Sequence, residues 1–107
     1  MAKLDLKENE KLIADAQASH VKKMLFIPQA NPGKLYVTDK RVIFEPTQGR
    51  ASSAFEHNLD EIESFSVGMA KSINIVLKSG ENHKITGMFN KKLIAAMEEV
   101  KIKRVEK

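Results

Sequence analysis

The sequence predicts a mainly β domain with one C-terminal α-helix: about seven short strands form a curved antiparallel sheet or open barrel, closed at one end by the helix. Two observations lead to this prediction. Short apolar runs recur about every ten residues, with Gly or Pro between many of them. Near the end the spacing becomes helical, because Leu93, Met97 and Val100 fall on one face. A chain of 107 residues is the size of one ordinary domain.

The strongest strand pattern is residues 33–44. Two apolar runs, Leu35-Tyr36-Val37 and Val42-Ile43-Phe44, flank the polar residues 38–41. Because β-branched and aromatic side chains suit a pleated, packed surface, both runs are expected to be strands. Four intervening residues suit a hairpin loop. We therefore expect this hairpin to lie at the centre of the fold.

Two further patterns precede the hairpin. Residues 12–19 alternate in polarity, which favours a strand, although their alanines favour a helix by propensity; we prefer the strand. The apolar run 24–27 ends at Pro28, and Asn31-Pro32-Gly33 is expected to form a loop. The run 24–27 has two interpretations, completion of the core or a surface for self-association.

The segments after the hairpin are shorter. The polar residues 46–53 are expected to form a loop, and Asn58 is expected to cap a single helical turn at 59–62. Lys78-Ser79-Gly80-Glu81 has the composition of a turn. The expected strands are 55–58, 62–67, 72–77 and 82–87.

The C-terminal helix is expected to start at Asn90 as N-cap, with Phe89 and Ile94 at the spacing of a hydrophobic staple. Its apolar stripe is expected to pack on the sheet. Lys91 and Lys92 lie in the first turn, where the helix dipole disfavours cations. This placement is either neutral or the mark of a surface that meets an anion.

Composition narrows the function classes. The sequence has no cysteine for a disulfide or thiolate, no apolar run of about 18 residues and no pattern of a secretory signal. These features favour a cytoplasmic location, which includes a peripheral position at the membrane. Of the net charge of +4, the last seven residues carry +3. We therefore expect a flexible segment at 1–10, one domain at 11–103 and a basic tail at 104–107. The tail is either solvated or contacts anionic lipid or RNA; without interleaved aromatic residues, nucleic acid is the weaker prediction.

The central stretch resembles the GRAM domain, a member of the pleckstrin-homology (PH)-like superfold. The residues that match the hairpin pattern of that family are Gly33, Leu35, Tyr36, Thr38, Asp39, Arg41, Val42, Ile43 and Phe44. Weaker similarity at 10–13, 59–62 and 73–80 extends the resemblance over roughly residues 10–100. Many relatives have Trp at the start of the final helix, where this chain has Phe89-Asn90-Lys91. The resemblance implies a PH-like open barrel of about seven strands capped by the helix.

The resemblance also implies a non-catalytic binding module that needs no cofactor and binds phosphoinositide-like anionic headgroups or docks a protein. The residues agree with a protein that is not an enzyme. His20, His57 and His83 are far apart in sequence and lack metal-ligand spacing, so a structural or surface role is the preferred interpretation over ligands or bases. The acidic cluster in 56–63 lacks the pattern of a calcium loop and is interpreted as a solvated edge. No Gly-x-Ser-x-Gly elbow or Gly-rich phosphate loop occurs.

An anion site is expected where loops gather at one end of the barrel, while Lys40, Arg41 and Lys71 gather at the other. The candidate ligand-binding residues are Lys22, Lys23, Lys34, Arg50, Lys78 and Lys84. Tyr36 and Arg41 are expected to be structural, with Arg41 bonded to a carbonyl or to Asp39. The alternative function is protein binding or homo-oligomerisation through a sheet edge or the run 24–27.

Overall fold

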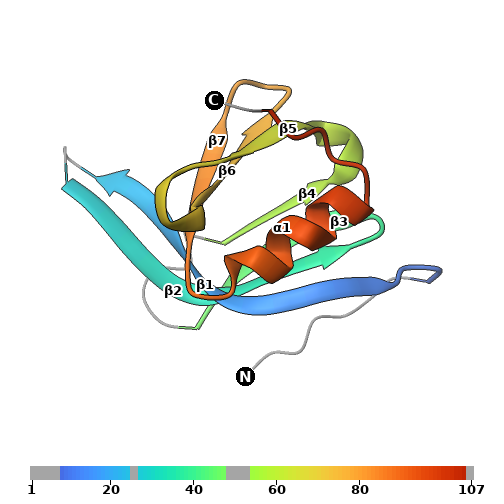
Figure 1. Cartoon of the computed structure of the whole chain (residues 1–107), viewed down its shortest axis with the longest axis horizontal. Helices are drawn as coiled ribbons and strands as arrows, with labels where there is room; N and C mark the ends of the chain where they lie inside the picture. The colour runs from blue at the N-terminus through green and yellow to red at the C-terminus, as the bar shows by residue number, and fades with distance from the viewer. Residues whose placement is uncertain (1–7, 25–26, 48–53, 106–107) are drawn as a thin grey trace.

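A computed structural model describes residues 8–24, 27–47 and 54–105, except for the side chains of 22–24, 27–29 and 70. Its seven strands form one antiparallel sheet in the order β4-β3-β2-β1-β7-β6-β5, and a single α-helix follows them. Figure 1 shows the sheet strongly curved, with α1 packed across it. This confirms the predicted fold class of a mainly β domain with one C-terminal helix.

The elements follow the predicted order. The two longest strands are β1 and β2, which form the first hairpin, and short 3₁₀ turns η2 and η3 flank β5. The bounds of all the elements are β1 Leu12–Met24, β2 Ile27–Thr38, β3 Arg41–Pro46, β4 Phe55–Asn58, η2 Leu59–Glu61, β5 Ile62–Val67, η3 Met69–Lys71, β6 Ile73–Leu77, β7 Asn82–Thr86 and α1 Asn90–Glu99. Asn58 precedes η2 as predicted, but its side chain makes no capping hydrogen bond.

The β1–β2 hairpin is longer than the sequence predicts. Residues 12–19 are a strand, as expected, but Asn31-Pro32-Gly33 lies within β2 and is not a loop. The register continues through Ser19↔Pro32 to Met24↔Ile27, and β3 pairs with β2 only from Gly33 onward. Pro32 lies just beyond the last β2–β3 pair, Gly33↔Pro46, and its carbonyl accepts from the amide of Thr47 there, so its missing N–H interrupts no β2–β3 pair.

The core lies between the inner face of the sheet and α1. Phe44, Phe65 and Ile85 from the strands pack in one cluster with Leu93 and Met97 of the helix, all at most 1% exposed. The predicted apolar stripe of the helix is therefore confirmed for Leu93 and Met97, and Val100 is partly buried against the same cluster. Ala16 and Ala18 of β1 are buried in that cluster too, where their short side chains leave room for the helix.

The start of α1 differs from the prediction. Phe89, not Asn90, is the N-cap residue, no side chain caps the helix, and Phe89 is 50% exposed, so the hydrophobic staple is absent. Asn90 is instead 1% exposed, and its amide nitrogen donates to the carbonyls of Lys71 and Ile85. This buried amide joins η3 and the end of β7 to the first turn of the helix.

Both predicted terminal segments are partly folded. Glu10 is 9% exposed and bonds Arg41, so the expected flexible segment 1–10 does not include it. At the other end, Lys101 adopts φ 67°, and the amides of Lys101 and Ile102 donate to the carbonyls of Glu98 and Met97. These bonds close the helix and turn the chain back along β5. Arg104, the first residue of the expected basic tail, forms a β-bridge with Phe65.

Candidate functional site

The six predicted anion-binding residues do not form one rim in the described part of the chain. Lys22 and Lys23 lie near the end of the β1–β2 hairpin, and Lys84 of β7 pairs across from the adjacent Val21. Arg50 lies outside the described residues. The structure thus brings Lys22, Lys23 and Lys84 onto neighbouring backbone positions.

The other two members lie elsewhere. Lys34 is in the middle of β2, where its Nζ lies 3.3 Å from Asp15 Oδ2 and 5.6 Å from the centre of the Tyr36 ring. Lys78 lies in the β6–β7 turn, and its amide donates to the carbonyl of Glu61 in η2. Because η2 also bonds Lys40 through the amide of Leu59, the Lys78 turn lies beside the Lys40 turn, not opposite to it.

A second group of lysines lies in the same chain segments as exposed apolar side chains. Met69 and Met88 are each 91% exposed, and Phe89 is 50% exposed. These side chains belong to two segments, η3 and the turn that leads into α1. A hydrogen bond of 2.9 Å from Asn90 Nδ2 to the carbonyl of Lys71 joins the two segments. We call this surface the lysine–methionine patch, and its residues are Met69, Lys71, Met88, Phe89, Lys91 and Lys92.

The patch continues into two surface cavities. Lys71 and Lys91 line a cavity of about 320 Å³ beside α1. Lys34, from the predicted anion site, lines a cavity of about 390 Å³ together with Met88 and Phe89. Sequence analysis missed the methionines, although the signal was present: each follows a glycine at a turn, where a large apolar side chain is not needed for the core.

The residues of the central hairpin have a structural role. Arg41 Nε and Nη2 donate to the two carboxylate oxygens of Glu10 at 2.7 and 2.9 Å, and Nη1 donates to Glu56 at 2.9 Å. Thr38 Oγ1 accepts from the Arg41 amide and donates to Glu10 Oε2. Asp39, one of the two partners expected for Arg41, accepts from the amide of Lys11. The hydrogen bond to Glu10 is the largest cause that raises the pKa of Arg41.

The structure also brings together the three histidines that the sequence leaves far apart. His57 Nε2 lies 3.1 Å from His83 Nε2, and His83 Nδ1 lies 3.2 Å from His20 Nε2. They come from β4, β7 and β1, at inward positions of strands that the curved sheet turns toward one another. Ring packing orders them, since Phe55 stacks on His83 with centroids 4.2 Å apart and an interplanar angle of 4°.

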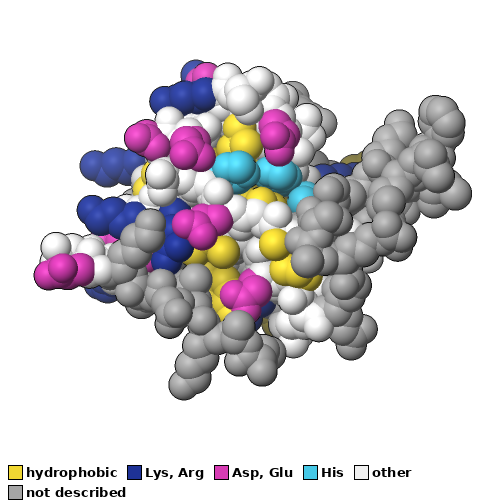
Figure 2. Space-filling model, turned by 180° about the vertical axis from the view of Figure 1, so that it is seen from behind, with side chains coloured by type: hydrophobic (Ala, Val, Ile, Leu, Met, Phe, Trp, Pro, Cys, Tyr) yellow, Lys and Arg dark blue, Asp and Glu magenta, His cyan; other side chains and the backbone are white. Residues whose placement is uncertain are grey.

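A surface cavity of about 570 Å³ opens over these histidines. Its lining includes Glu56, Glu81 and Lys84. Figure 2 shows the histidines as one cyan group near the middle of this face, with acidic side chains around it. His57, Glu81 and His83 offer ligand atoms that all lie within 4.8 Å of one another. The histidine cavity, with its imidazole and carboxylate groups, has the chemistry to bind a cation. The lysine–methionine patch combines positive charge with exposed apolar side chains, the combination that suits an anionic membrane surface.

No helix in the described ranges is long and apolar enough to cross a membrane. A search of curated proteins found no match. Among solved structures, this chain is similar to the C-terminal domain of an unknown protein from Leishmania infantum, with a TM-score of 0.70, 20% identity and coverage of 87% of this chain and 86% of that one.

Two further structures share the fold. The Vps36 N-terminal PH domain matches with a TM-score of 0.61 and 20% identity over 89% of this chain and 84% of its own. A chain of the Spt16D Pob3N heterodimer matches with a TM-score of 0.55 and 13% identity over 89% of this chain and 56% of its own. The family model described as GRAM domain matches residues 1–107. With the PH-like barrel and the hairpin residues in place, the chain belongs to the GRAM domain family.

Proposed function

We propose that this protein binds anionic lipid membranes through the lysine–methionine patch. A GRAM domain with a PH-like fold is in general a lipid- or protein-binding module, and such domains are typically non-catalytic. The observation that carries the proposal is the pair of methionines, 91% exposed each, on turns flanked by lysines. Soluble proteins rarely expose a contiguous apolar patch without using it for an interface.

The apolar side chains provide one part of the binding energy. Moving a fully exposed Met or Phe side chain out of water is favourable by about 1.5–3 kcal/mol. Met69 and Met88 project from turns, so they can enter the boundary between headgroups and acyl chains without rearrangement of the sheet. In the free protein these apolar side chains are in contact with water, which is unfavourable, and membrane binding would remove that contact.

The lysines provide the second part. Each Lys near an anionic membrane surface contributes about 1 kcal/mol. Within the described ranges, Lys71, Lys91 and Lys92 are exposed and form none of the observed ion pairs. Lys91 and Lys92 also oppose the dipole of α1 in its first turn, at about 0.3–1 kcal/mol each. A surface that meets anionic headgroups accounts for this otherwise unfavourable placement.

The predicted residues at the end of the β1–β2 hairpin are a second proposed contact. Lys22, Lys23 and Lys84 lie on adjacent positions there, next to the apolar run 24–27 of the sequence. In Figure 1 the end of this hairpin and the turn between β5 and β6 lie on the same side of the molecule. A membrane on that side meets both.

Sedimentation with vesicles tests the proposal. We expect binding to vesicles that contain phosphatidylserine, weaker binding as salt increases, and little binding to neutral phosphatidylcholine vesicles. The double variants Met69→Ser/Met88→Ser and Lys91→Glu/Lys92→Glu are expected to lose most of the bound fraction. Lys101→Glu/Lys103→Glu makes the same charge change away from the patch and is the matched control.

The stability of the same variants separates lost binding from misfolding. Replacing Lys91 and Lys92 by Glu favours the helix dipole, so this variant is expected to melt at the wild-type temperature or above it. Lys22→Glu/Lys23→Glu tests the hairpin end in the same assay. Wild-type protein that stays in the supernatant at low salt contradicts the proposal, as does a lysine–methionine variant that binds as well as its control.

Protein binding through the outer edge of β2 is the second candidate function. Among the described residues, β2 pairs with β3 only over 33–37, and the ladder pairs of residues 27–31 are those with β1. Such an edge can accept a strand from a partner or from a second copy. One of the similar chains comes from the structure of the Spt16D Pob3N heterodimer. Light scattering tests self-association: a mass that rises with concentration supports it, and a monomer at all concentrations excludes it.

A further inference from the structure

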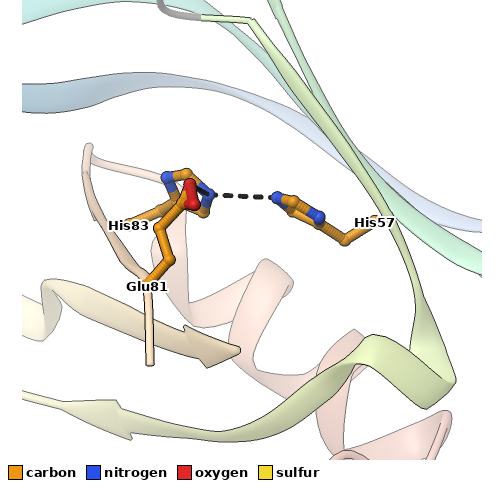
Figure 3. Close-up of side chains that lie close together, drawn as sticks. All are labelled: His57, Glu81 and His83. Atoms are coloured by element: carbon orange, nitrogen blue, oxygen red, sulfur yellow. Dashed lines mark hydrogen bonds and ion pairs between the residues drawn. The ribbon is translucent and has the colours of Figure 1, made fainter. Parts of the chain in front are cut away.

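We propose that His57, Glu81 and His83 form a site for a divalent transition-metal ion such as Zn²⁺. The two histidine Nε2 atoms are 3.1 Å apart, and Glu81 Oε2 lies 3.6 Å from His83 Nε2. All three ligand atoms lie within 4.8 Å of one another. Figure 3 shows Glu81 and His83 reaching the site from one stretch of chain and His57 from the opposite side, with the two imidazoles facing each other.

The spacing matches tetrahedral coordination. Zinc–nitrogen and zinc–oxygen bonds of about 2.0–2.2 Å place neighbouring ligand atoms roughly 3.3–3.5 Å apart. The observed separations of 3.1 and 3.6 Å lie close to this range on either side. The ligand atoms of the third pair, His57 and Glu81, lie within 4.8 Å of each other, so side-chain rotation would have to complete the site.

The fold holds the two sides of the site independently of metal. Glu81 directly precedes β7 and His83 is the second residue of that strand, so the two are two positions apart along one extended segment. His57 comes from β4, which does not pair with β7 in the sheet order. The ion would therefore join the two halves of the barrel where the curved sheet remains open.

Both histidines have a partner that orients the second ring nitrogen. Glu61 Oε1 lies 3.4 Å from His57 Nδ1, and His20 Nε2 lies 3.2 Å from His83 Nδ1. A neutral imidazole has one ring proton, so a proton on Nδ1 that is donated to these partners puts the metal-binding lone pair on Nε2. Carboxylate–histidine–metal arrangements of this kind are usual in metal sites.

The donor set and its surroundings define the class of ion. Two imidazoles and one carboxylate suit Zn²⁺ and its neighbours in the first transition row, whereas Mg²⁺ and Ca²⁺ prefer oxygen ligands. The side chain of Glu81 is 62% exposed, so the cavity of about 570 Å³ admits an ion from solvent. Lys84 also lines this cavity and opposes a cation, while Glu56 favours one.

Metal binding by the untagged chain tests this proposal. We expect calorimetry to find one Zn²⁺ per chain, an increase in melting temperature with Zn²⁺ that a chelator reverses, and no such increase with Mg²⁺. Co²⁺ in place of Zn²⁺ should give the visible absorption of a tetrahedral site. Glu81→Gln and His57→Gln are expected to weaken Zn²⁺ binding at least about tenfold, and Glu61→Gln by about tenfold.

Glu63→Gln, on β5 and exposed, removes the same charge without a metal ligand and is the matched control. Because Glu81 is mostly exposed, its variant should keep the wild-type melting temperature without metal, so a failure to fold cannot account for its loss of binding. Absence of saturable Zn²⁺ binding overturns the proposal. Equal affinity of Glu81→Gln, His57→Gln and the control also overturns it, because the ion must then bind elsewhere.

Discussion

At the scale of single residues, the ion pair between Arg41 and Glu10 is the main polar anchor of the described fold. Their side chains are 7% and 0% exposed, and the bidentate contact satisfies both carboxylate oxygens of Glu10. The pKa of Arg41 is raised above its usual value, chiefly by the hydrogen bond to Glu10, so Arg41 stays charged at every pH at which the protein is handled. A buried charge pair of this kind tolerates the loss of neither partner alone.

The first prediction concerns this pair. Arg41→Met leaves Glu10 buried without its cation and is expected to lower the free energy of unfolding by about 3–5 kcal/mol. Removing both charges with Glu10→Gln/Arg41→Met should recover part of that loss. Urea unfolding followed by circular dichroism measures both, and Glu56→Gln is the control, because a half-exposed partner contributes about 1 kcal/mol or less. Equal losses for Arg41→Met and Glu56→Gln would contradict the assignment.

The second prediction uses the single tyrosine of a chain without tryptophan. Burial is the largest cause that raises the pKa of Tyr36, while the charge of Lys34 opposes it. A group whose pKa is higher in the folded state stabilises that state below its unfolded value of about 10, and this contribution is lost as the pH rises through the folded pKa. We therefore expect the free energy of unfolding to fall in alkaline solution.

Tyrosinate absorbance measures this directly. The native protein should titrate at higher pH than the same chain in urea, and Lys34→Gln should move the native midpoint higher still, because it removes the opposing charge. Glu45→Gln should move it lower, since Glu45 contributes in the other direction. A native midpoint at or below that of the unfolded chain would show that the Tyr36 hydroxyl is not desolvated.

Residue partners were the least predictable feature of this sequence. The pattern of the hairpin indicates that Arg41 is structural, but its partner Glu10 lies 31 positions earlier, in a segment without periodicity. The histidines illustrate the same limit: His20 and His83 are 63 positions apart and meet only through the curvature of the sheet. Spacing arguments find side chains that meet on one element, whereas these three histidines come from three strands, β1, β4 and β7.

At the scale of elements, β2 shows how a turn-like composition can belong to a strand. Asn31-Pro32-Gly33 predicts a loop by local preference, yet Gly33 lies inside the strand because β3 approaches it closely. A Cβ at Gly33 would lie 2.5 Å from the carbonyl oxygen of Glu45 and 2.7 Å from Pro46 Cα. The glycine is required by contact with the next strand, and its sequence neighbours do not reveal that contact.

The third prediction follows. Gly33→Ala forces backbone atoms of β3 to move and is expected to destabilise the fold by about 1–3 kcal/mol. Gly68→Ala is the matched control, since a Cβ there meets only the Ser72 hydroxyl, at 3.0 Å. Thermal unfolding compares the two variants. If Gly33→Ala melts at the same temperature as Gly68→Ala, then β3 yields easily and the glycine at position 33 has no steric role.

At the scale of the whole molecule, the number and order of elements were predictable, but their pairing was not. Each short strand carries its own alternation, so strands after the hairpin were found with bounds within a residue of those observed. The meeting of β1 with both β2 and β7, and the close approach of β4 to β7, depend on how the whole sheet curves. The lysine–methionine patch and the histidine cluster both arise at this scale.

In the order of the sheet, β5 is the strand at one edge, and the chain after α1 covers it. The amide of Phe65 donates to the carbonyl of Lys103, the amide of Val105 donates to the carbonyl of Phe65, and Ile102 is 8% exposed. Together they bury an apolar side chain and occupy hydrogen-bonding groups that an open edge would offer to other chains.

The fourth prediction tests this cover. Deleting residues 102–107 is expected to lower the free energy of unfolding by about 2–4 kcal/mol, from the burial of Ile102 and the two backbone hydrogen bonds. The freed β5 edge should also make the protein associate, which light scattering detects as a mass that grows with concentration. Deleting only residues 106 and 107 leaves the pairing in place and should change neither quantity. Should both deletions behave alike, the return of the chain along β5 contributes nothing, and the edge is protected by the β5 side chains themselves.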